Sequence, residues 1–408
     1  MKNKMLAINK KILLFLLAGA ALMQAACKKD SGGGPVITGL RAISPAPNDS
    51  ALTTAGPGQW VVIRGSHLSG ATSVFFNGYS SSFNAALFSD TTMAVNIPSD
   101  MPFASLDTSK LNTVTVVTTH GTATYKFPIV PPPPVITALS NEYAQAGLQI
   151  TITGNNFFFI QKVVFPGNIA VTSGITSNVS GTSIQVTVPA GITTSGTIQV
   201  VNRYGTGTSM LRFNDFVTGV MHNYDNVNNY SWGAGSSSSS TAYPNNWGTY
   251  GVMNASGVGG GDLGWWNGNR SINLNSVQWV PLGYMSQTLD YFALKFEINV
   301  TTPWTGGSLY IVKDYDWTYV ARYEPWLNAD GTTTNYTSKG WQTVVIPLSS
   351  FRTKANGLDG TGNPAATMAG LLGSSGAGGI DIMFVNSGTT AVASFEAAID
   401  NIRVEKIK

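Results

Sequence analysis

The first half of the chain contains an internal repeat, which restricts the possible folds more than any other feature. The motif Pro-Val-Ile-Thr begins at Pro35 and again at Pro134. After each copy, short runs of alternating β-branched and polar residues are separated by Gly, Asn and Pro. This alternation predicts strands that bury one face, and the intervening residues predict turns. We therefore expect two consecutive β-sandwiches, at 35–130 and 131–216.

The two copies also correspond strand by strand. Residues 61–65 (VVIRG) match 150–154 (ITITG), and residues 74–78 (VFFNG) match 163–167 (VVFPG). A strand that ends in Gly and is followed by Val-x-Phe-x-Gly resembles the IPT/TIG immunoglobulin-like domain. The resemblance implies a structural or spacer role for both copies. Four consecutive prolines, 131–134, join them and predict an extended, semi-rigid linker.

The N-terminal residues have the features of a secretory signal peptide. Residues 1–26 combine a basic start, an apolar run and small residues at the end. Cys27 follows directly and is the only cysteine, so an internal disulfide is excluded. We expect Cys27 to carry the lipid of a bacterial lipoprotein, with residues 27–34 as a flexible tether and membrane contact only through that lipid. The alternative is a free thiol.

The charge balance argues against a polyanionic partner. Only 11% of the residues are charged, and four of the 23 basic residues lie in the leader. The remaining 19 basic residues face 20 acidic ones. Because nucleic-acid binding requires a basic surface, the composition excludes a nucleic-acid partner and favours neutral ligands.

Tryptophan is concentrated in the last part of the chain, where nine of the ten tryptophans follow residue 216. We expect residues 217–408 to form a larger β-sandwich of the jelly-roll type, so that the fold class is all-β. The Gly/Asn/Trp-rich stretch 223–269 is long for a loop, and we expect it to be partly disordered or to wrap the edge of the sandwich. The expected strands are 291–300, 307–313, 317–323, 342–348, 379–385 and 395–405.

Several aromatic residues of this domain are candidates for sugar binding, since their rings offer flat apolar surfaces to the C–H face of a sugar. In a strand, Trp317, Tyr319 and Tyr323 point to one face and predict a stacking platform. The alternative is that this face belongs to the core. Trp326 follows the strand-breaking Pro325, and we expect it at the rim of the sheet or on a loop.

The remaining tryptophans divide into two groups. Trp304 leads from a strand into a glycine turn, and Trp265 and Trp266 are adjacent among glycines. For these three, ligand contact and loop anchoring are equally good interpretations, and we include them in the predicted glycan site. Trp279 and Trp341 lead into apolar strands, and we expect them to be structural.

Little in the sequence indicates catalysis, and we predict no catalytic residue, cofactor or metal. The three histidines form no metal-like pair, and neither a nucleophile elbow nor a P-loop is present. A glycosidase would need two carboxyl groups flanking the scissile bond, and Asp314, Asp316 and Glu324 leave such a pair open. Asp314, Asp316 and Asp330 also leave a structural calcium open.

The whole chain resembles the surface glycan-binding lipoproteins that accompany TonB-dependent glycan importers in Gram-negative bacteria. Residues 303–307 (PWTGG), 322–326 (RYEPW) and 340–344 (GWQTV) resemble the xyloglucan-binding domain of that family. The resemblance implies non-catalytic capture of a neutral plant-type polysaccharide, xyloglucan or a related β-glucan. It also implies a place at the outer membrane, facing outward, beside a TonB-dependent importer complex. The alternatives are a glycoside hydrolase with immunoglobulin-like spacers and a surface adhesin.

Overall fold

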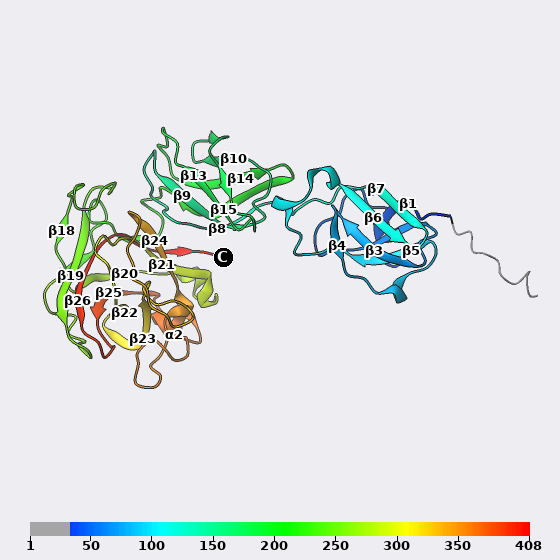
Figure 1. The fold of residues 1–408 in the computed structure, drawn as a ribbon. Helices are drawn as coiled ribbons and strands as arrows, with labels where there is room; N and C mark the ends of the chain where they lie inside the picture. Colours follow the sequence, from blue (N-terminus) through cyan, green and yellow to red (C-terminus); the bar gives the residue numbers. More distant parts are fainter. Residues whose placement is uncertain (1–32) are drawn as a thin grey trace, which may run out of the picture. The chain divides into compact units, whose positions relative to one another are not determined.

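The computed structural model describes residues 33–408, so the expected signal peptide and Cys27 lie outside the described residues. Internal contacts divide the chain into two compact units, which meet in sequence between Pro132 and Pro133. Both units are built from β-sheets, which confirms the all-β fold class (Figure 1). In the described part, no helix has the length and apolar character needed to cross a membrane.

The first unit is a sandwich of a three-stranded and a four-stranded sheet. Val61 and Ile63 of one sheet and Val74 and Phe76 of the other are fully buried, as the period-two pattern predicts. In sheet order the strands are β1 (Val36–Ala42), β2 (Trp60–Ser66) and β5 (Thr92–Asn96), then β4 (Tyr79–Ser81), β3 (Ala71–Phe76), β6 (Thr113–Thr118) and β7 (Gly121–Lys126).

The second repeat forms the same kind of sandwich at the start of the second unit. Its equivalent residues Ile150, Ile152, Val163 and Phe165 are at most 1% exposed, so the repeat in sequence is a repeat of the core. One sheet consists of β12 (Thr176–Ser177), β13 (Ser183–Thr187), β9 (Gln149–Asn155) and β8 (Val135–Leu139), and the other of β11 (Ile169–Val171), β10 (Ile160–Phe165), β14 (Gly196–Asn202) and β15 (Gly205–Phe213).

Each repeat requires a glycine near the end of its second strand, and the reason is steric. A Cβ on Gly65 would lie 1.8 Å from the carbonyl oxygen of Val36, and one on Gly154 would lie 1.9 Å from that of Val135. The pairing with the first strand of the repeat shifts register close to this point in both copies. A side chain would push the two strands apart, so the repeat motif requires Gly.

The C-terminal part of the second unit is a larger antiparallel sandwich of two sheets (Figure 1). The first sheet runs β18 (Ser236–Ser237), β19 (Tyr250–Val258), β26 (Val392–Lys406), β21 (Phe292–Asn299) and β24 (Gln342–Pro347), with β16 (Val220–His222) also paired to β26. The second sheet runs β17 (Tyr230–Gly233), β20 (Ser271–Gln278), β25 (Ala377–Val385), β22 (Ser308–Lys313) and β23 (Asp316–Tyr323).

Helical structure is short throughout the described residues. The α-helix α2 (Met368–Leu372) is capped by the Thr367 side chain, which accepts a hydrogen bond from the Gly370 N–H. Single turns of 3₁₀-helix occur at Ala85–Leu87, Phe103–Ser105, Thr108–Lys110, Leu282–Tyr284, Leu289–Tyr291 and Leu348–Ser350.

Each of the six strands expected after residue 290 is present, with ends that differ by at most three residues. Of the two expectations for residues 223–269, wrapping the edge of the sandwich agrees with the structure, because β17 and β18 are edge strands of the two sheets. The same stretch also contributes β19, and its serine run begins in β18. The short lengths of β17 and β18, and the Gly and Asn residues around them, hide them from a periodicity argument. β20 was also not expected.

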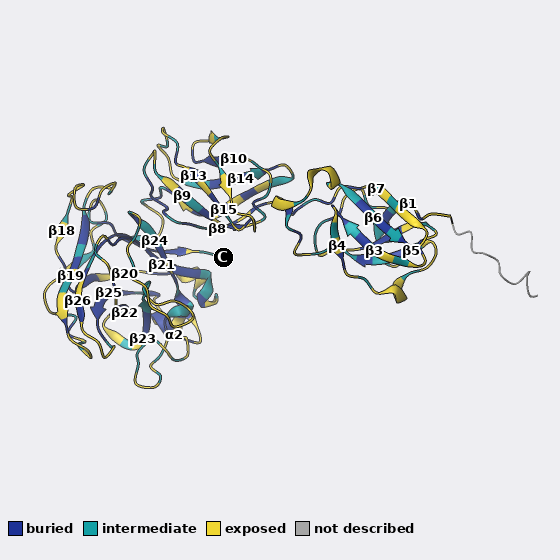
Figure 2. Ribbon diagram, viewed as in Figure 1, coloured by how far each residue is buried: buried dark blue, intermediate teal, exposed yellow. Residues whose placement is uncertain are grey.

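The main core lies between the two sheets of this sandwich, and Figure 2 shows β21, β22, β25 and β26 as largely buried. Trp279 is 2% exposed, and its indole Nε1 donates to the Gly378 carbonyl at 3.1 Å. Trp341 is 8% exposed and packs against Tyr243 and Tyr250. Their expected structural role agrees with this burial.

A buried ion network joins the second immunoglobulin-like sandwich to the C-terminal one within the second unit. Glu142, which follows β8, contacts Lys295 at 2.8 Å and Arg403 at 2.7 Å. Lys295 also contacts Glu405, and Arg403 contacts Glu297 at 2.8 Å. The immunoglobulin-like sandwich thus covers the outer face of β21 and β26, which explains why every residue of β21 is buried.

Candidate functional site

Five aromatic residues gather on the outer face of the second C-terminal sheet. This aromatic platform consists of Trp232, Trp265, Trp266, Tyr315 and Trp317. Trp266 is 59%, Tyr315 42% and Trp232 38% exposed, whereas Trp265 and Trp317 are half-buried. Such a grouping of exposed rings on a folded surface indicates a binding site, because single exposed aromatics are common but clusters are not.

The rings of the platform contact one another around Trp265. Its ring stacks on Tyr315 with centroids 5.6 Å apart and an interplanar angle of 19°. It also lies 5.7 Å from Trp232 and 5.6 Å from Trp266, the latter edge-on. The Trp232 indole Nε1 donates to the Tyr315 hydroxyl at 2.9 Å. Three rings from three separate segments thus fix one another in place.

A small apolar cluster supports the platform from below. Trp265 and Trp317 pack on buried side chains of three neighbouring strands, whose alternate residues belong to the main core on the other face of the sheet. The Trp317 ring lies edge-on to Tyr310, with centroids 6.1 Å apart. The supporting residues are Tyr310, Val312, Val320, Met383 and Val385.

Local backbone structure places the outer rings. Asp314 and Tyr315 form the two-residue turn between β22 and β23, with φ of 51° and 57°, as in the turns that join twisted hairpins. The Tyr315 N–H donates to Asp381 Oδ2 at 2.7 Å. The loop that carries Trp265 and Trp266 is fixed by an ion pair of 2.9 Å between Arg270 and Asp262.

The prediction that Trp317, Tyr319 and Tyr323 share one face of β23 is wrong. Tyr319 and Tyr323 pack against the main core, whereas Trp317 packs on the opposite face with Tyr310 and Val320. The pairing of β22 with β23 shifts register between Ile311 and the Lys313–Asp316 pair. Because of this shift, simple alternation does not carry Trp317 to the face of Tyr323.

The expectation that Trp304 contacts ligand is also wrong, because Trp304 is fully buried. Its Nε1 donates to the Gly306 carbonyl at 2.8 Å, and its ring lies 4.9 Å from that of Phe395 in the core. Trp326 is half-buried against the same core and donates to the Gly307 carbonyl at 2.7 Å. Trp304, Tyr323 and Trp326 are therefore grouped together, away from the platform.

Three of the residues expected from the sequence, Trp265, Trp266 and Trp317, lie together in the structure. Trp232 and Tyr315 of the platform were not expected from the sequence. A hairpin turn within Lys-Asp-Tyr-Asp-Trp, at 313–317, was the available signal for an exposed Tyr315. No signal was available for Trp232, whose place depends on the pairing of β17 with β20.

The acidic residues near the platform accept hydrogen bonds from backbone N–H groups. Asp314 accepts from the Gly379 N–H, and Asp316 accepts from the Thr318 N–H. Hydrogen bonds from the Thr318 side chain and backbone lower the pKa of Asp316. Burial raises the pKa of Asp381 to about 6, but Asp381 is 1% exposed. No group of three His, Cys, Asp or Glu side chains suited to a metal ion occurs between residues 33 and 408.

Asp381 makes stability pH-dependent. Its Oδ1 and the Oδ1 of Asn273, its cross-strand neighbour, are both buried without a hydrogen-bond partner among the described residues. Because its folded pKa of about 6 exceeds its ordinary value of 3.8, this group stabilises the fold fully below about pH 3.8, and that stability is lost as pH rises through about 6. We expect Asp381→Asn to become more stable relative to the parent between about pH 5 and about pH 7.5.

Urea unfolding at both pH values measures this difference. Asp330→Asn is the matched control, since Thr332 hydrogen bonds lower the pKa of Asp330 below its ordinary value and out of this pH window. An Asp381→Asn difference that stays constant with pH would contradict the assignment of a neutral, buried carboxyl.

Comparisons with known proteins agree with this architecture. Residues 213–406 match the family described as the surface glycan-binding protein B xyloglucan binding domain, and residues 134–214 match the IPT/TIG domain. An IPT/TIG domain-containing protein of Bacteroides ovatus is 31% identical over 157 residues, which are 38% of this chain. The match spans about a third (32%) of that relative's length.

Two solved structures share the fold over nearly the whole chain. A surface glycan-binding protein B of Prevotella bryantii aligns with a TM-score of 0.70 and 20% identity, covering 92% of this chain and 99% of that one. A protein of the same kind from a complex xyloglucan utilization locus of Bacteroides uniformis aligns with a TM-score of 0.51 and 19% identity, covering 91% and 99%.

Proposed function

We propose that this protein binds a polysaccharide without cleaving it. The premise is that residues 213–406 belong to the surface glycan-binding protein B xyloglucan binding domain family. The single observation that carries the proposal is the aromatic platform, in which Trp232, Trp265 and Tyr315 are held in mutual contact on an exposed face. Because the rings are already held in place, they lose little side-chain freedom when a ligand binds. This low cost matters most for a ligand with weak individual contacts, such as a sugar chain.

The chemistry of the platform favours a neutral β-glucan as the ligand. Equatorial hydroxyl groups leave the faces of β-linked glucose rings apolar, so that an extended chain can stack on successive aromatic rings. The exposed indole and phenol rings offer this surface over more than one sugar unit. Xyloglucan, whose main chain is a β-glucan, is the ligand that we propose first, because it is the ligand named by the matching family.

The buried position of Asp381 supports a non-catalytic role. A glycosidase acid needs a raised pKa and access to the glycosidic oxygen. Asp381 has the raised pKa, but its side chain lies beneath the platform and its Oδ2 is occupied by the Tyr315 N–H. We therefore infer capture of glycan, with delivery to an outer-membrane TonB-dependent importer as the proposed destination.

A panel of soluble polysaccharides tests the proposed function. Native gel electrophoresis with xyloglucan, mixed-linkage glucan, mannan or xylan in the gel should show retarded migration in at least one β-glucan. A reducing-end assay on the same mixtures should detect no release. Unretarded migration in every gel would contradict glycan binding, and released reducing ends would establish a hydrolase.

Lipid anchoring is a separate prediction of the proposed surface location. We expect Cys27→Ala to move the protein from the membrane fraction to the soluble fraction of a Gram-negative host, because the lipid would be the only membrane contact. Immunoblots of fractionated cells measure this, with Cys27→Ala retaining glycan binding as the control. A variant that remains in the membrane fraction would contradict the anchor.

A further inference from the structure

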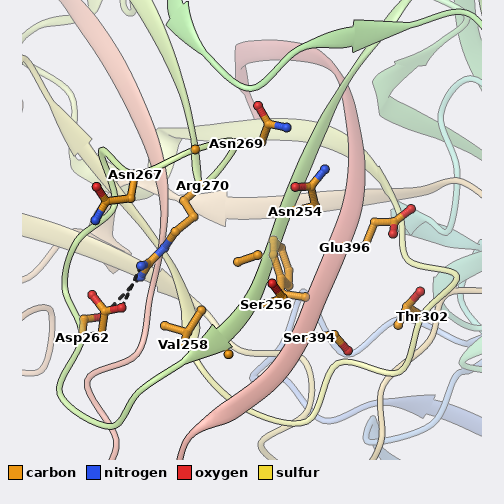
Figure 3. Close-up of a pocket in the computed structure, with 14 residues that line it drawn as sticks. Asn254, Ser256, Val258, Asp262, Asn267, Asn269, Arg270, Thr302, Ser394 and Glu396 are labelled. Atoms are coloured by element: carbon orange, nitrogen blue, oxygen red, sulfur yellow. Dashed lines mark hydrogen bonds and ion pairs between the residues drawn. The ribbon is translucent and has the colours of Figure 1, made fainter.

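A groove lies on the first sheet of the C-terminal sandwich, which is not the sheet that carries the aromatic platform. This polar groove is lined by Asn254 and Ser256 of β19, Ser394 and Glu396 of β26, and Asn269 (Figure 3). Its volume of about 580 Å³ lies within the roughly 300–1,000 Å³ of small-molecule sites. The groove is therefore large enough for a ligand of the size of a short saccharide.

Strand register explains why the lining is polar. Asn254 lies opposite Glu396, and Ser256 lies opposite Ser394, in the β19–β26 ladder. The residues between them, Phe395 among them, point into the main core. The four polar side chains therefore share the outer face of the two strands.

Most of these groups are free to meet a ligand. The side-chain amide of Asn254 and the hydroxyls of Ser256 and Ser394 have no hydrogen-bond partner among the described residues, and all three residues are exposed. Glu396 is half-buried, and its Oε1 accepts from the Tyr243 hydroxyl at 2.6 Å. The groove thus combines donors, acceptors and one oriented carboxylate over a small area.

Charge limits the class of ligand. Arg270 at the edge of the groove is neutralised by Asp262 at 2.9 Å, as Figure 3 shows. The carboxylate of Glu396 remains as the uncompensated charge, so an anionic ligand would be repelled. Amide, hydroxyl and carboxylate groups, with the one basic side chain already paired, suit an uncharged, hydroxyl-rich ligand.

The groove and the platform share one loop. Trp265 and Trp266 of this loop belong to the platform, while Asn267 and Asn269 line the groove. The two surfaces lie on different sheets of the sandwich, so a short oligosaccharide on the platform leaves the groove free. A long polysaccharide can reach both.

We propose that the polar groove is a second saccharide-binding site, which takes an uncharged polyhydroxylated sugar segment through hydrogen bonds rather than stacking. The inference rests on the proposed function, because it takes the platform as the first contact with the same polymer. The second contact raises the apparent affinity for polymer, since binding at the platform makes binding at the groove intramolecular.

Ser394→Arg tests the proposal by filling the groove from an exposed strand position. We expect at least about a fivefold loss of apparent affinity for polymeric xyloglucan in affinity gels. The affinity for a xyloglucan oligosaccharide, measured by tryptophan fluorescence, should stay unchanged. Ser236→Arg, at an exposed serine of β18 outside the groove, is the matched control and should behave like the parent in both assays.

Asn254→Ala combined with Ser256→Ala removes hydrogen bonds without adding bulk and should lower polymer affinity in the same direction. Parent-like polymer affinity in both groove variants, while Trp265→Ala loses binding, would overturn the second site and leave the proposed function intact. Failure of the parent protein to bind any polysaccharide would instead overturn the proposed function.

Discussion

Replacing Trp265 by alanine is expected to lower the affinity for a neutral β-glucan about tenfold or more. Trp265 contacts Trp232, Trp266 and Tyr315, so its removal takes away one stacking surface and one supporting contact from each of these three rings. Stacking of a base on an aromatic ring contributes about 1–3 kcal/mol, and we take the sugar case as comparable at most. A loss of about 1.4 kcal/mol corresponds to a factor of ten.

Isothermal titration with a xyloglucan oligosaccharide measures this loss. Trp60→Ala is the matched control, because Trp60 is 45% exposed but lies on β2 of the first unit. Trp266→Ala is a second platform variant. Because the Trp266 side chain is 59% exposed, we expect its removal to have little effect on folding. Parent-like affinity in both platform variants would contradict the assignment of the platform.

Replacing Arg403 by leucine is expected to lower the free energy of unfolding by about 3–5 kcal/mol, the cost of leaving buried charges without their partner. Arg403 is fully buried, and burial alone would lower its pKa, but Glu297 and Glu142 raise that pKa well above its ordinary value. For Glu297, in contrast, burial raises the pKa to about 7, even with Arg403 beside it. Without Arg403, these carboxylates would lose their principal counter-charge.

Chemical denaturation measures this effect, and Lys408→Ala is its control. Lys408 pairs with Asp290 at 2.6 Å, but both side chains are about half exposed, and such pairs contribute about 0–1 kcal/mol. We expect the two variants to differ by several-fold in their loss of stability. An Arg403→Leu variant as stable as the Lys408→Ala variant would contradict a role for the network in joining the two sandwiches.

The apolar patterns of the sequence were sufficient to predict the matching strands of the two repeats and the six strands after residue 290, but not β19 and β20. Ile150 and Ile152 alternate with Thr151 and Thr153 in β9, and burial of one face follows directly. The same reasoning failed for Trp317 and Tyr323, because a register shift between β22 and β23 separates their faces. Periodicity predicts the face of a residue only within an uninterrupted ladder.

The platform depends on contacts that local patterns do not contain. Trp232, Trp265 and Tyr315 come from three segments that are far apart in the sequence, and only the order of strands in the sheet brings them together. Trp304 and Trp266 both stand among glycines, yet one is fully buried and the other 59% exposed. Tryptophan content alone therefore indicated the binding domain but did not identify the binding residues.

We infer that glycan contacts the rings of the platform rather than Trp304 and Trp326. Nuclear magnetic resonance of the ¹⁵N-labelled indole groups, assigned by single Trp→Phe variants, tests it during titration with a xyloglucan oligosaccharide. We expect shifted indole signals for Trp232, Trp265 and Trp266, and unchanged signals for Trp304 and Trp326. Shifts confined to Trp304 and Trp326, with the platform signals unchanged, would contradict it.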